Sequence, residues 1–305
     1  MVADELKARN LLHIQDLYKE YDGKMILDNI DLSVSKGAFV TVCGPSGCGK
    51  STLLRLILGQ EEQTSGELSI DNRPVGFANK DRGIVYQRYS LMPNKTVLEN
   101  VLLGYRLGVF GVSWKSTKNE RIEEAMEYLT SAKLADARDK YPHELSGGMQ
   151  QRVAVMQALI MKPKILMMDE PFGALDPGTR EDVQLFLLKQ WKEHDMTIFF
   201  VTHDLEEAVF LGTRLIVLSQ YYSDDRGFDL HHLKHGAKIV ADRDIVHNND
   251  DIDGSIDEKM TAQFGQLIEE IRHEGFDPQN LQHVTEFNLK HHNSFQTLTE
   301  AETNQ

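Results

Sequence analysis

The sequence contains few of the features that mark secreted or membrane-spanning proteins. Its only two cysteines, Cys43 and Cys48, fall in one apolar stretch and the loop after it, so they do not form a disulfide framework. Uninterrupted apolar runs, such as Ile198 to Val201, are far shorter than the roughly 18 residues that span a bilayer. The first residues lack the basic and apolar regions of a signal peptide. We therefore expect a chain that works in a reducing compartment.

Acidic residues outnumber basic ones, 47 to 33. The 305 residues carry a formal net charge of −14, which argues against nucleic acid as the main partner. The length allows one large domain and an appendage. Apolar strand patterns alternate with helical patterns, with β-rich segments at 11–34 and 66–86, so we expect an α/β fold with a largely parallel sheet.

A glycine-rich loop is the first feature that points to chemistry. An apolar run at 38–43 leads into it and a helical pattern at 53–58 follows, which is the context of a phosphate-binding loop. Backbone N–H groups at such a helix start favour a polyphosphate, although a turn without a ligand is the alternative. Lys50 would reach the outer phosphates and Ser51 would hold magnesium. The loop consists of Gly44, Pro45, Ser46, Gly47, Cys48, Gly49, Lys50 and Ser51, with Thr52 after it.

The same helix start bears on cysteine reactivity. A helix N-terminus lowers the pKa of a thiol, so we expect Cys48 to react faster than Cys43 when no nucleotide is bound.

Two further motifs follow the loop. Residues 165–168 are apolar and end in Asp169 and Glu170, as in a buried parallel strand whose end faces the nucleotide. Asp169 is a candidate magnesium ligand, and Glu170 is the candidate for polarising the attacking water. Residues 145–152 read Leu-Ser-Gly-Gly-Met-Gln-Gln-Arg.

These motifs, in this order and spacing, resemble those of ATP-binding cassette (ABC) ATPases over residues 10–220. The resemblance rests on Tyr21, the loop at 44–51, Gln87, the octapeptide at 145–152, Asp169, Glu170, Ala174, Leu175, Asp176 and His203. It implies a P-loop NTPase ABC cassette with a RecA-like parallel-sheet core, an N-terminal antiparallel β subdomain and a helical subdomain at about 88–160.

The resemblance also implies ATP and Mg²⁺ as cofactors and assigns roles to single residues. Tyr21 would stack on adenine, unless it is simply a tyrosine at a strand end. Gln87 would touch the metal and couple the nucleotide to a transport partner. Glu170, Lys50 and His203 would be catalytic, and His203 would contact the γ-phosphate. Further nucleotide contacts would come from Ser146, Gly147, Gly148, Gln150 and Asp176, the last at the subunit interface.

The glycines at 147 and 148 precede a helical stretch from Met149 to Met161, which makes a second helix start able to receive an anion. One chain has a single phosphate loop, so this second helix start has no nucleotide to bind within its own subunit. Two copies arranged head to tail would hold each ATP between the phosphate loop of one subunit and the octapeptide of the other. We expect a homodimer in the ATP-bound state, in which Ser146 contacts the nucleotide of the opposite subunit.

We expect a cassette without a fused membrane domain, so a transport role would require separate permease subunits. The segments at 171–176, 201–208 and 212–214 resemble the nitrate, sulfonate and taurine importer branch, and those at 81–90, 98–104 and 158–163 resemble a subgroup associated with urea or guanidine carboxylase systems. The expected place is the cytoplasmic membrane face, peripherally bound, with a periplasmic or lipoprotein solute-binding protein as an indirect partner. The alternatives are a soluble non-transport ABC ATPase and a small-molecule kinase.

The region between Gln87 and the octapeptide reads as helical, with an amphipathic helix at 118–134. Residues 89–94 and 96–101 resemble a surface on which a permease helix docks, or else they pack on their own domain.

Residues 221–305 form an acidic, His-rich extension. They hold 17 Asp and Glu against 7 Lys and Arg. A short docked helix is expected from Met260 to Ile271, because its apolar residues share one helical face. Residues 249–257 resemble part of a calcium loop but lack the final glutamate, so an acidic linker is favoured. Histidines at 231, 232, 235, 291 and 292 are interpreted as polar surface residues, with metal binding left open.

Overall fold

The computed structural model describes residues 2–86, 91–108, 118–173, 175–223, 236–245 and 262–297. The chain forms two compact units. Unit 1 contains Met1–Phe77 and Phe199–Gln305, and unit 2 contains Ala78–Ile198. The extension beyond residue 220 is thus part of the same unit as the phosphate loop.

Unit 1 begins with helix α1 and an antiparallel sheet in the strand order β2-β1-β4-β5. The hairpin between β1 and β2 turns at Asp22 and Gly23, which both have positive φ. This Asp-Gly pair suits the two-residue turn that matches strand twist, and it brings Tyr21 opposite Lys24. The elements are α1 (Val2–Arg9), β1 (Leu12–Tyr21), β2 (Lys24–Val34), β4 (Ser65–Ile70) and β5 (Arg73–Pro74).

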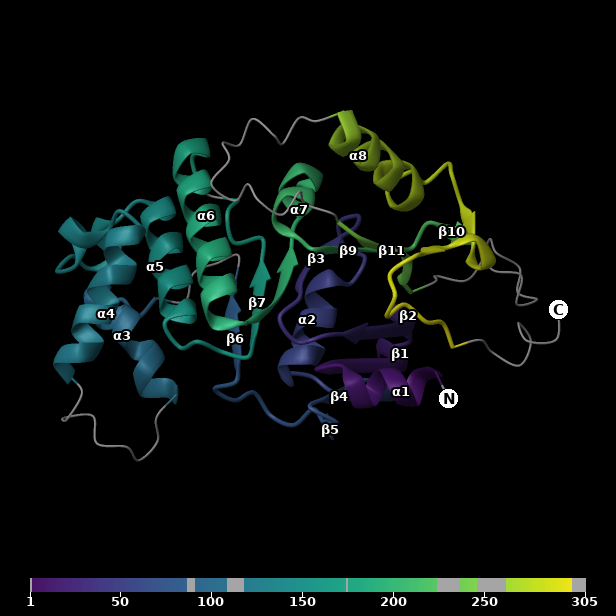
Figure 1. Cartoon of the computed structure of the whole chain (residues 1–305), viewed down its shortest axis with the longest axis horizontal. Helices are drawn as coiled ribbons and strands as arrows, with labels where there is room; N and C mark the ends of the chain where they lie inside the picture. The colour runs from purple at the N-terminus through teal and green to yellow at the C-terminus, as the bar shows by residue number, and fades with distance from the viewer. Residues whose placement is uncertain are drawn as a thin grey trace. The chain divides into compact units, whose positions relative to one another are not determined.

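A second sheet in unit 1 carries the phosphate loop (Figure 1). Its strands follow the order β13-β11-β9-β3, with β3 and β9 parallel and β9 and β11 antiparallel. All five residues of β3 are buried, as their continuous apolar run requires. The strands are β3 (Phe39–Cys43), β9 (Arg214–Ser219), β11 (Lys238–Asp244) and β13 (Asn288–Leu289), with a small pair of β10 (Tyr222–Ser223) and β12 (Gln282–His283).

Helices of unit 1 pack around this second sheet. They are α2 (Lys50–Leu58), α7 (Leu205–Leu211), α8 (Ala262–Gly275) and a 3₁₀ turn at Val284–Glu286. Strand β8 (Thr197–Val201) begins in unit 2 and ends in unit 1.

The docked helix predicted in the extension is α8. Ile268 and Ile271 are buried in a cluster with Val217 and Val240, and Phe264 and Leu267 pack against it. The apolar face of α8 is thus covered by residues of β9 and β11 in the same chain. Met260 lies outside the described residues, as do the calcium-like segment at 249–257 and the histidines at 231, 232 and 235.

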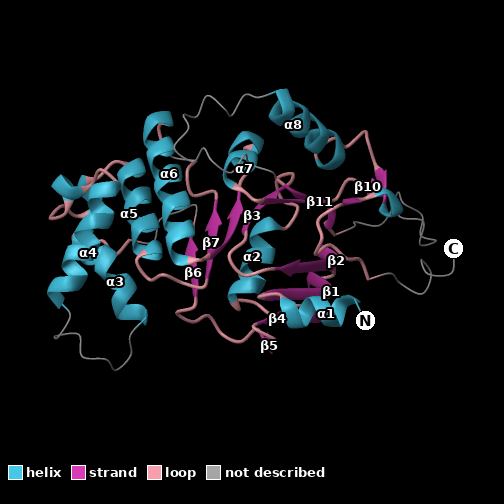
Figure 2. Cartoon of the chain, viewed as in Figure 1, coloured by secondary structure: helices cyan, strands magenta, loops and turns pink. Residues whose placement is uncertain are grey.

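Unit 2 combines a parallel strand pair with a group of helices (Figure 2). Gly104 lets α3 and α5 approach closely, because a Cβ at this position would lie 2.6 Å from the carbonyl oxygen of Gln157. The helix predicted at 118–134 is present as α4, but it ends at Ser131, where the chain enters a turn. The elements are β6 (Arg82–Val85), α3 (Val97–Gly108), α4 (Lys118–Ser131), 3₁₀ turns at Ala135–Ala137 and Pro142–Glu144, α5 (Gly147–Leu159), β7 (Ile165–Asp169) and α6 (Pro177–His194).

Within the described ranges, no helix is both long enough and apolar enough to cross a lipid bilayer.

Candidate functional site

The phosphate loop connects the end of β3 to the start of α2. Its last glycine, Gly49, is the N-cap of α2 with a φ of 103°, and among the described residues no side chain caps this helix. The first turn of α2 also contains no acidic residue. Backbone N–H groups at this helix start are therefore left without the side-chain partners that usually satisfy them, as an anion-binding loop requires.

Lys50 occupies the inside of the loop. Its Nζ donates to the carbonyl oxygens of Gly44 and Pro45 at 2.8 and 2.9 Å, and the residue is buried. Both acceptors are neutral, so a phosphate oxygen that carries a full negative charge would compete well for the ammonium group.

Glycine is required at positions 44 and 47 of the loop for different structural reasons. A Cβ on Gly44 would lie 2.0 Å from the carbonyl oxygen of Leu218, so only glycine fits between the loop and β9. Gly47 has a φ of +79° but open space around it, so its requirement is conformational rather than steric. Backbone can thus approach a ligand closely at Gly47.

Cys48 differs from the expectation for a reactive thiol. Its side chain is 1% exposed, and burial raises its pKa, although Lys50 acts in the opposite direction. The predicted lowering of the pKa by the helix start is therefore wrong in this conformation, because loss of hydration outweighs the helix dipole. Burial also raises the pKa of Cys43, which is fully buried.

The remaining loop residues divide between solvent and core. Ser46 and Ser51 are exposed, which leaves the Ser51 hydroxyl accessible to a ligand. Thr52 is buried and its hydroxyl accepts a hydrogen bond from Arg55 at 3.2 Å.

Tyr21 ends β1 and is 37% exposed. Its hydroxyl donates to the carboxylate of Glu61, and Lys19 Nζ lies 4.7 Å from its ring centroid. Glu61 also pairs with Arg55 of α2 at 2.9 Å. These contacts hold a flat aromatic surface at the strand end. Sequence reasoning did not identify Glu61, because the contact joins residues 40 positions apart.

His203 follows β8 on a short loop and is exposed. The loop is anchored to α7, because the Thr202 hydroxyl donates to the buried carboxylate of Glu207 at 2.6 Å. Asp204 caps α7 by accepting from the backbone N–H groups of Glu206 and Glu207 at 3.0 and 3.1 Å. The histidine is therefore presented on a fixed turn.

A pocket beside His203 includes Arg272 of helix α8 and Phe276, which directly follows that helix. Arg272 and Phe276 line it together with His203, Asp204, Leu205 and Glu206. The sequence did not indicate that α8 would come this close to a candidate catalytic residue.

Unit 2 contains the acidic strand end. Asp169 is the last residue of β7 and is half-buried, and Glu170 follows it with a positive φ of 47°. A left-handed conformation at a glutamate costs about 1 kcal/mol, which the surrounding structure must offset. The Nε2 of Gln151 lies 3.5 Å from the backbone oxygen of Glu170, which links this turn to α5.

The octapeptide forms the start of α5 in unit 2. Ser146 is the N-cap, and its exposed hydroxyl oxygen accepts from the N–H of Met149 at 3.3 Å. The hydroxyl proton can still donate to an anion, since capping uses a lone pair. Gly147 and Gly148 are half-buried, and Gln150 turns its side chain back to the carbonyl oxygen of Leu145 at 3.2 Å.

Asp176 is exposed and caps α6 by accepting from the N–H of Thr179 at 3.1 Å. Hydrogen bonding to Thr179 lowers its pKa. The residue therefore has a structural task whether or not it also contacts a partner.

The predicted site residues are thus distributed over both units. Unit 1 contains Tyr21, residues 44–52 and His203, and unit 2 contains Ser146, Gly147, Gly148, Gln150, Asp169, Glu170 and Asp176. Gln87 lies outside the described residues.

The phosphate loop combines a buried strand, a glycine-rich turn around a lysine and a helix start that no described side chain caps. These features define a phosphate-binding nucleotide cassette. The family described as ABC transporter matches residues 27–173. An uncharacterized ABC transporter ATP-binding protein of Methanocaldococcus jannaschii is 46% identical over 224 residues, which cover 71% of this chain and 82% of that protein. The chain belongs to the ABC transporter family and is an ATPase.

Two relatives with named solutes are also similar. The nitrate import ATP-binding protein NrtD of Synechocystis sp. is 46% identical over 212 residues, which cover 68% of this chain and 77% of that protein. The taurine import ATP-binding protein TauB of Rhizobium johnstonii is 40% identical over 248 residues, which cover 81% of this chain and 87% of that protein. This agrees with the branch that the sequence resembles.

Solved structures show the same fold. A dimeric bacterial ABC transporter cassette superposes with a TM-score of 0.65 at 32% identity and covers 77% of this chain and 99% of that one. A dimeric cassette in a post-hydrolysis state with ADP and Pi superposes with a TM-score of 0.60, also at 32% identity and the same coverage.

Proposed function

We propose that this chain is the ATP-hydrolysing subunit of an ABC importer that takes up a small polar solute through a separate membrane permease. The observation that carries the nucleotide part is the start of α2, which lies beside the buried Lys50 ammonium group and is capped by no side chain from the described part of the chain. The similarity to nitrate and taurine import subunits supports the transport part. The solute would be nitrate-, sulfonate- or taurine-like, or urea- or guanidine-like.

The residues fit ATP and Mg²⁺ in their chemistry. Lys50 would exchange two neutral carbonyl acceptors for phosphate oxygens, and Tyr21 offers an aromatic face for adenine. Ser51, Asp169 and Gln87 supply the oxygen ligands that magnesium prefers, and the ion would neutralise charge on the phosphates.

Hydrolysis requires a base and a group that stabilises the γ-phosphate. Glu170 would accept a proton from the attacking water, and His203 on its fixed turn would contact the γ-phosphate. Ser146, Gly147 and Gly148 would bind the γ-phosphate of the opposite subunit, with Gln150 and Asp176 at the same interface. ATP would therefore hold a homodimer together, and hydrolysis would release it.

The proposed partners follow from this cycle. A peripheral position on the cytoplasmic membrane face would let the dimer drive permease subunits, and a solute-binding protein would deliver the solute on the other side. An importer subunit should co-purify with a permease. Recovery of an active ATPase without any membrane subunit, at native expression, would favour a soluble non-transport ABC ATPase instead.

The Glu170→Gln variant tests the base. It should keep ATP binding and lose at least about 100-fold of its turnover, because the base is lost but the phosphate loop is intact. It should therefore accumulate as an ATP-bound dimer in gel filtration with ATP and magnesium. Near-normal hydrolysis, or a chain that stays monomeric with ATP, would contradict the assignment.

The Ser146→Arg variant tests the contribution in trans. A bulky cation at this position should block hydrolysis while the subunit's own phosphate loop still binds nucleotide. Normal hydrolysis by this variant would show that the octapeptide does not complete the partner's site.

A further inference from the structure

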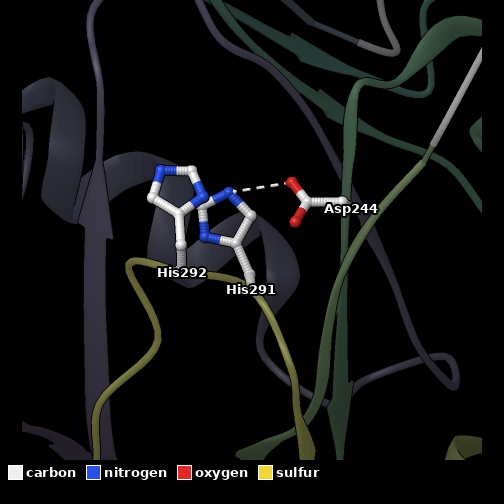
Figure 3. A group of neighbouring side chains, drawn as sticks. All are labelled: Asp244, His291 and His292. Atoms are coloured by element: carbon white, nitrogen blue, oxygen red, sulfur yellow. Dashed lines mark ion pairs between the residues drawn. The ribbon is translucent and has the colours of Figure 1, made fainter.

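Three side chains of the C-terminal extension that could ligate a metal ion converge in unit 1 (Figure 3). Asp244 ends β11, and His291 and His292 follow β13, so segments far apart in the sequence meet here. One ligand atom from each residue lies within 4.8 Å of the other two. None of the three is needed by the nucleotide chemistry proposed above.

One pair of the trio already has the spacing of two ligands on a single ion. His291 Nε2 lies 3.3 Å from Asp244 Oδ1, and the two histidine rings have centroids 4.2 Å apart. Ligand atoms around a tetrahedral zinc ion are separated by about 3.3 Å, given bonds of about 2.0 Å. Asp244 and His292 are exposed, so small rotations of their side chains would close the remaining gap.

We propose that Asp244, His291 and His292 form a site for a divalent transition metal ion of the zinc class. Two imidazoles and one carboxylate suit Zn²⁺ and its neighbours, whereas Mg²⁺ and Ca²⁺ prefer oxygen ligands throughout. Three protein ligands leave a coordination position for water.

The buried side of the trio is fixed by a second layer of contacts. The backbone N–H of His291 donates to the carbonyl oxygen of Asp242 at 3.0 Å. Arg214 holds the Asp242 carboxylate in a buried bidentate ion pair. Its Nε and Nη2 donate to Oδ1 and Oδ2 of Asp242 at 2.7 and 2.6 Å. Such an outer layer positions a ligand before the ion arrives, which reduces the entropy lost on binding.

Metal binding requires one change in His291. The backbone N–H of Asn293 donates to His291 Nδ1 at 3.0 Å, so in the neutral ring the proton resides on Nε2, facing Asp244. For Nε2 to coordinate an ion, this proton must move to Nδ1, and the Asn293 N–H must then give up its acceptor. The ion therefore competes with a local hydrogen bond, which limits its affinity and couples the site to the turn at 291–294.

This turn connects to the N-terminal sheet of the same unit. The Asn293 amide donates to Ser35 at 3.0 Å, and the Phe295 ring stacks on His13 with centroids 5.3 Å apart. Occupation of the site would thus be transmitted to residues that pack on β1.

Metal titration of the purified full chain tests the proposal. The protein is stripped with a chelator, dialysed and titrated with Co²⁺, whose visible absorption reports its ligands, and then with Zn²⁺ by calorimetry. We expect one equivalent of bound ion in the wild type. His292→Ala and Asp244→Ala should each weaken it at least tenfold, and both residues are exposed, so these variants should fold.

His273→Ala is the matched control, because His273 is exposed on α8 of the same extension. It should bind the ion as the wild type does, while all other histidines of the chain stay the same in every variant. X-ray absorption of the zinc-bound wild type should show two imidazole ligands and that of His292→Ala only one. The proposal is overturned if the wild type binds no ion, if His292→Ala and Asp244→Ala match the control, or if fewer than two imidazoles surround the ion.

Discussion

The hydroxyl of Thr202 donates a 2.6 Å hydrogen bond to the buried carboxylate of Glu207, directly beneath the loop that presents His203. The backbone N–H of Thr202 also donates to the carbonyl oxygen of Val42, next to the phosphate loop, at 3.3 Å. Thr202 therefore ties the His203 turn both to α7 and to β3.

This relationship predicts a positioning effect on catalysis. Thr202→Val removes the donor, so we expect turnover to fall about tenfold while ATP affinity changes little, since the phosphate loop is untouched. Measurement of kcat and KM, with nucleotide binding measured separately, checks this. Glu269→Gln, at an exposed position of α8 that is not among the residues lining the His203 pocket, is the control. Equal loss of binding and turnover in Thr202→Val would indicate general destabilisation instead.

The two loop glycines predict different stability losses. Gly44→Ala forces a Cβ to within 2.0 Å of the Leu218 carbonyl oxygen, so the strand or the loop must move, at about 3 kcal/mol or more. Gly47→Ala meets open space and should cost about 1 kcal/mol, because only its φ of +79° is unfavourable. Urea unfolding without nucleotide measures both. Similar losses at the two positions would contradict the close contact with β9.

Docking of the C-terminal helix predicts a stability effect for Ile271. This side chain is fully buried in the cluster with Val217 and Val240, so Ile271→Ala should cost about 2–5 kcal/mol. Glu269→Ala, at an exposed position of α8, should stay within about 0.5 kcal/mol of the wild type. If both variants unfold at the same urea concentration as the wild type, α8 is not docked in solution. Because α8 buries Ile271 against the sheet, we also expect removal of the extension to lower the free energy of unfolding.

His13 predicts a pH dependence of folding. Burial lowers the pKa of His13 below the ordinary 6.5, and Lys7 acts in the same direction. The hydrogen bond with Gln15 and the charges of Glu67 and Asp31 raise the pKa but do not outweigh burial. The folded state therefore binds the proton less well than the unfolded state. Its contribution to stability is complete above about pH 6.5 and is lost as the pH falls through the lowered folded pKa.

Urea unfolding of the wild type and of His13→Gln between pH 7.5 and 5 measures this contribution. The wild type should lose stability more steeply than the variant as the pH falls. If the free energy of unfolding changes with pH in the same way for the wild type and the variant, His13 is not the titrating group.

The proposed metal site predicts a change in backbone protection. When an ion binds His291 Nε2, the Asn293 N–H loses its acceptor, so its hydrogen exchange should accelerate in the presence of Zn²⁺. The Asp244→Ala variant should show no such response. Slower exchange at Asn293 in the zinc-bound wild type would mean that the ring binds the ion without releasing this bond.

Much of the nucleotide chemistry could be predicted from the sequence because its determinants are local. A glycine run, a lysine and a helix start within residues 44–52 suffice to specify an anion-binding loop, whatever packs around it. The apolar strand ending at Asp169 and the helix start after Ser146 follow from short patterns in the same way. The amphipathic faces of α4 and α8 were equally readable, because their period depends only on the helix.

Other features were decided by tertiary structure. The thiol of Cys48 is buried, so hydration rather than the helix dipole determines its pKa, and burial cannot be read from the loop motif. The contacts of Tyr21 with Glu61 and of Asp244 with His291 join residues 40 or more positions apart, and no local pattern specifies them. The sequence by itself determined which groups can bind phosphate, because backbone geometry is local. Only the fold decided which side chains support those groups and which histidines meet a carboxylate, because side-chain partners depend on how distant strands and helices pack.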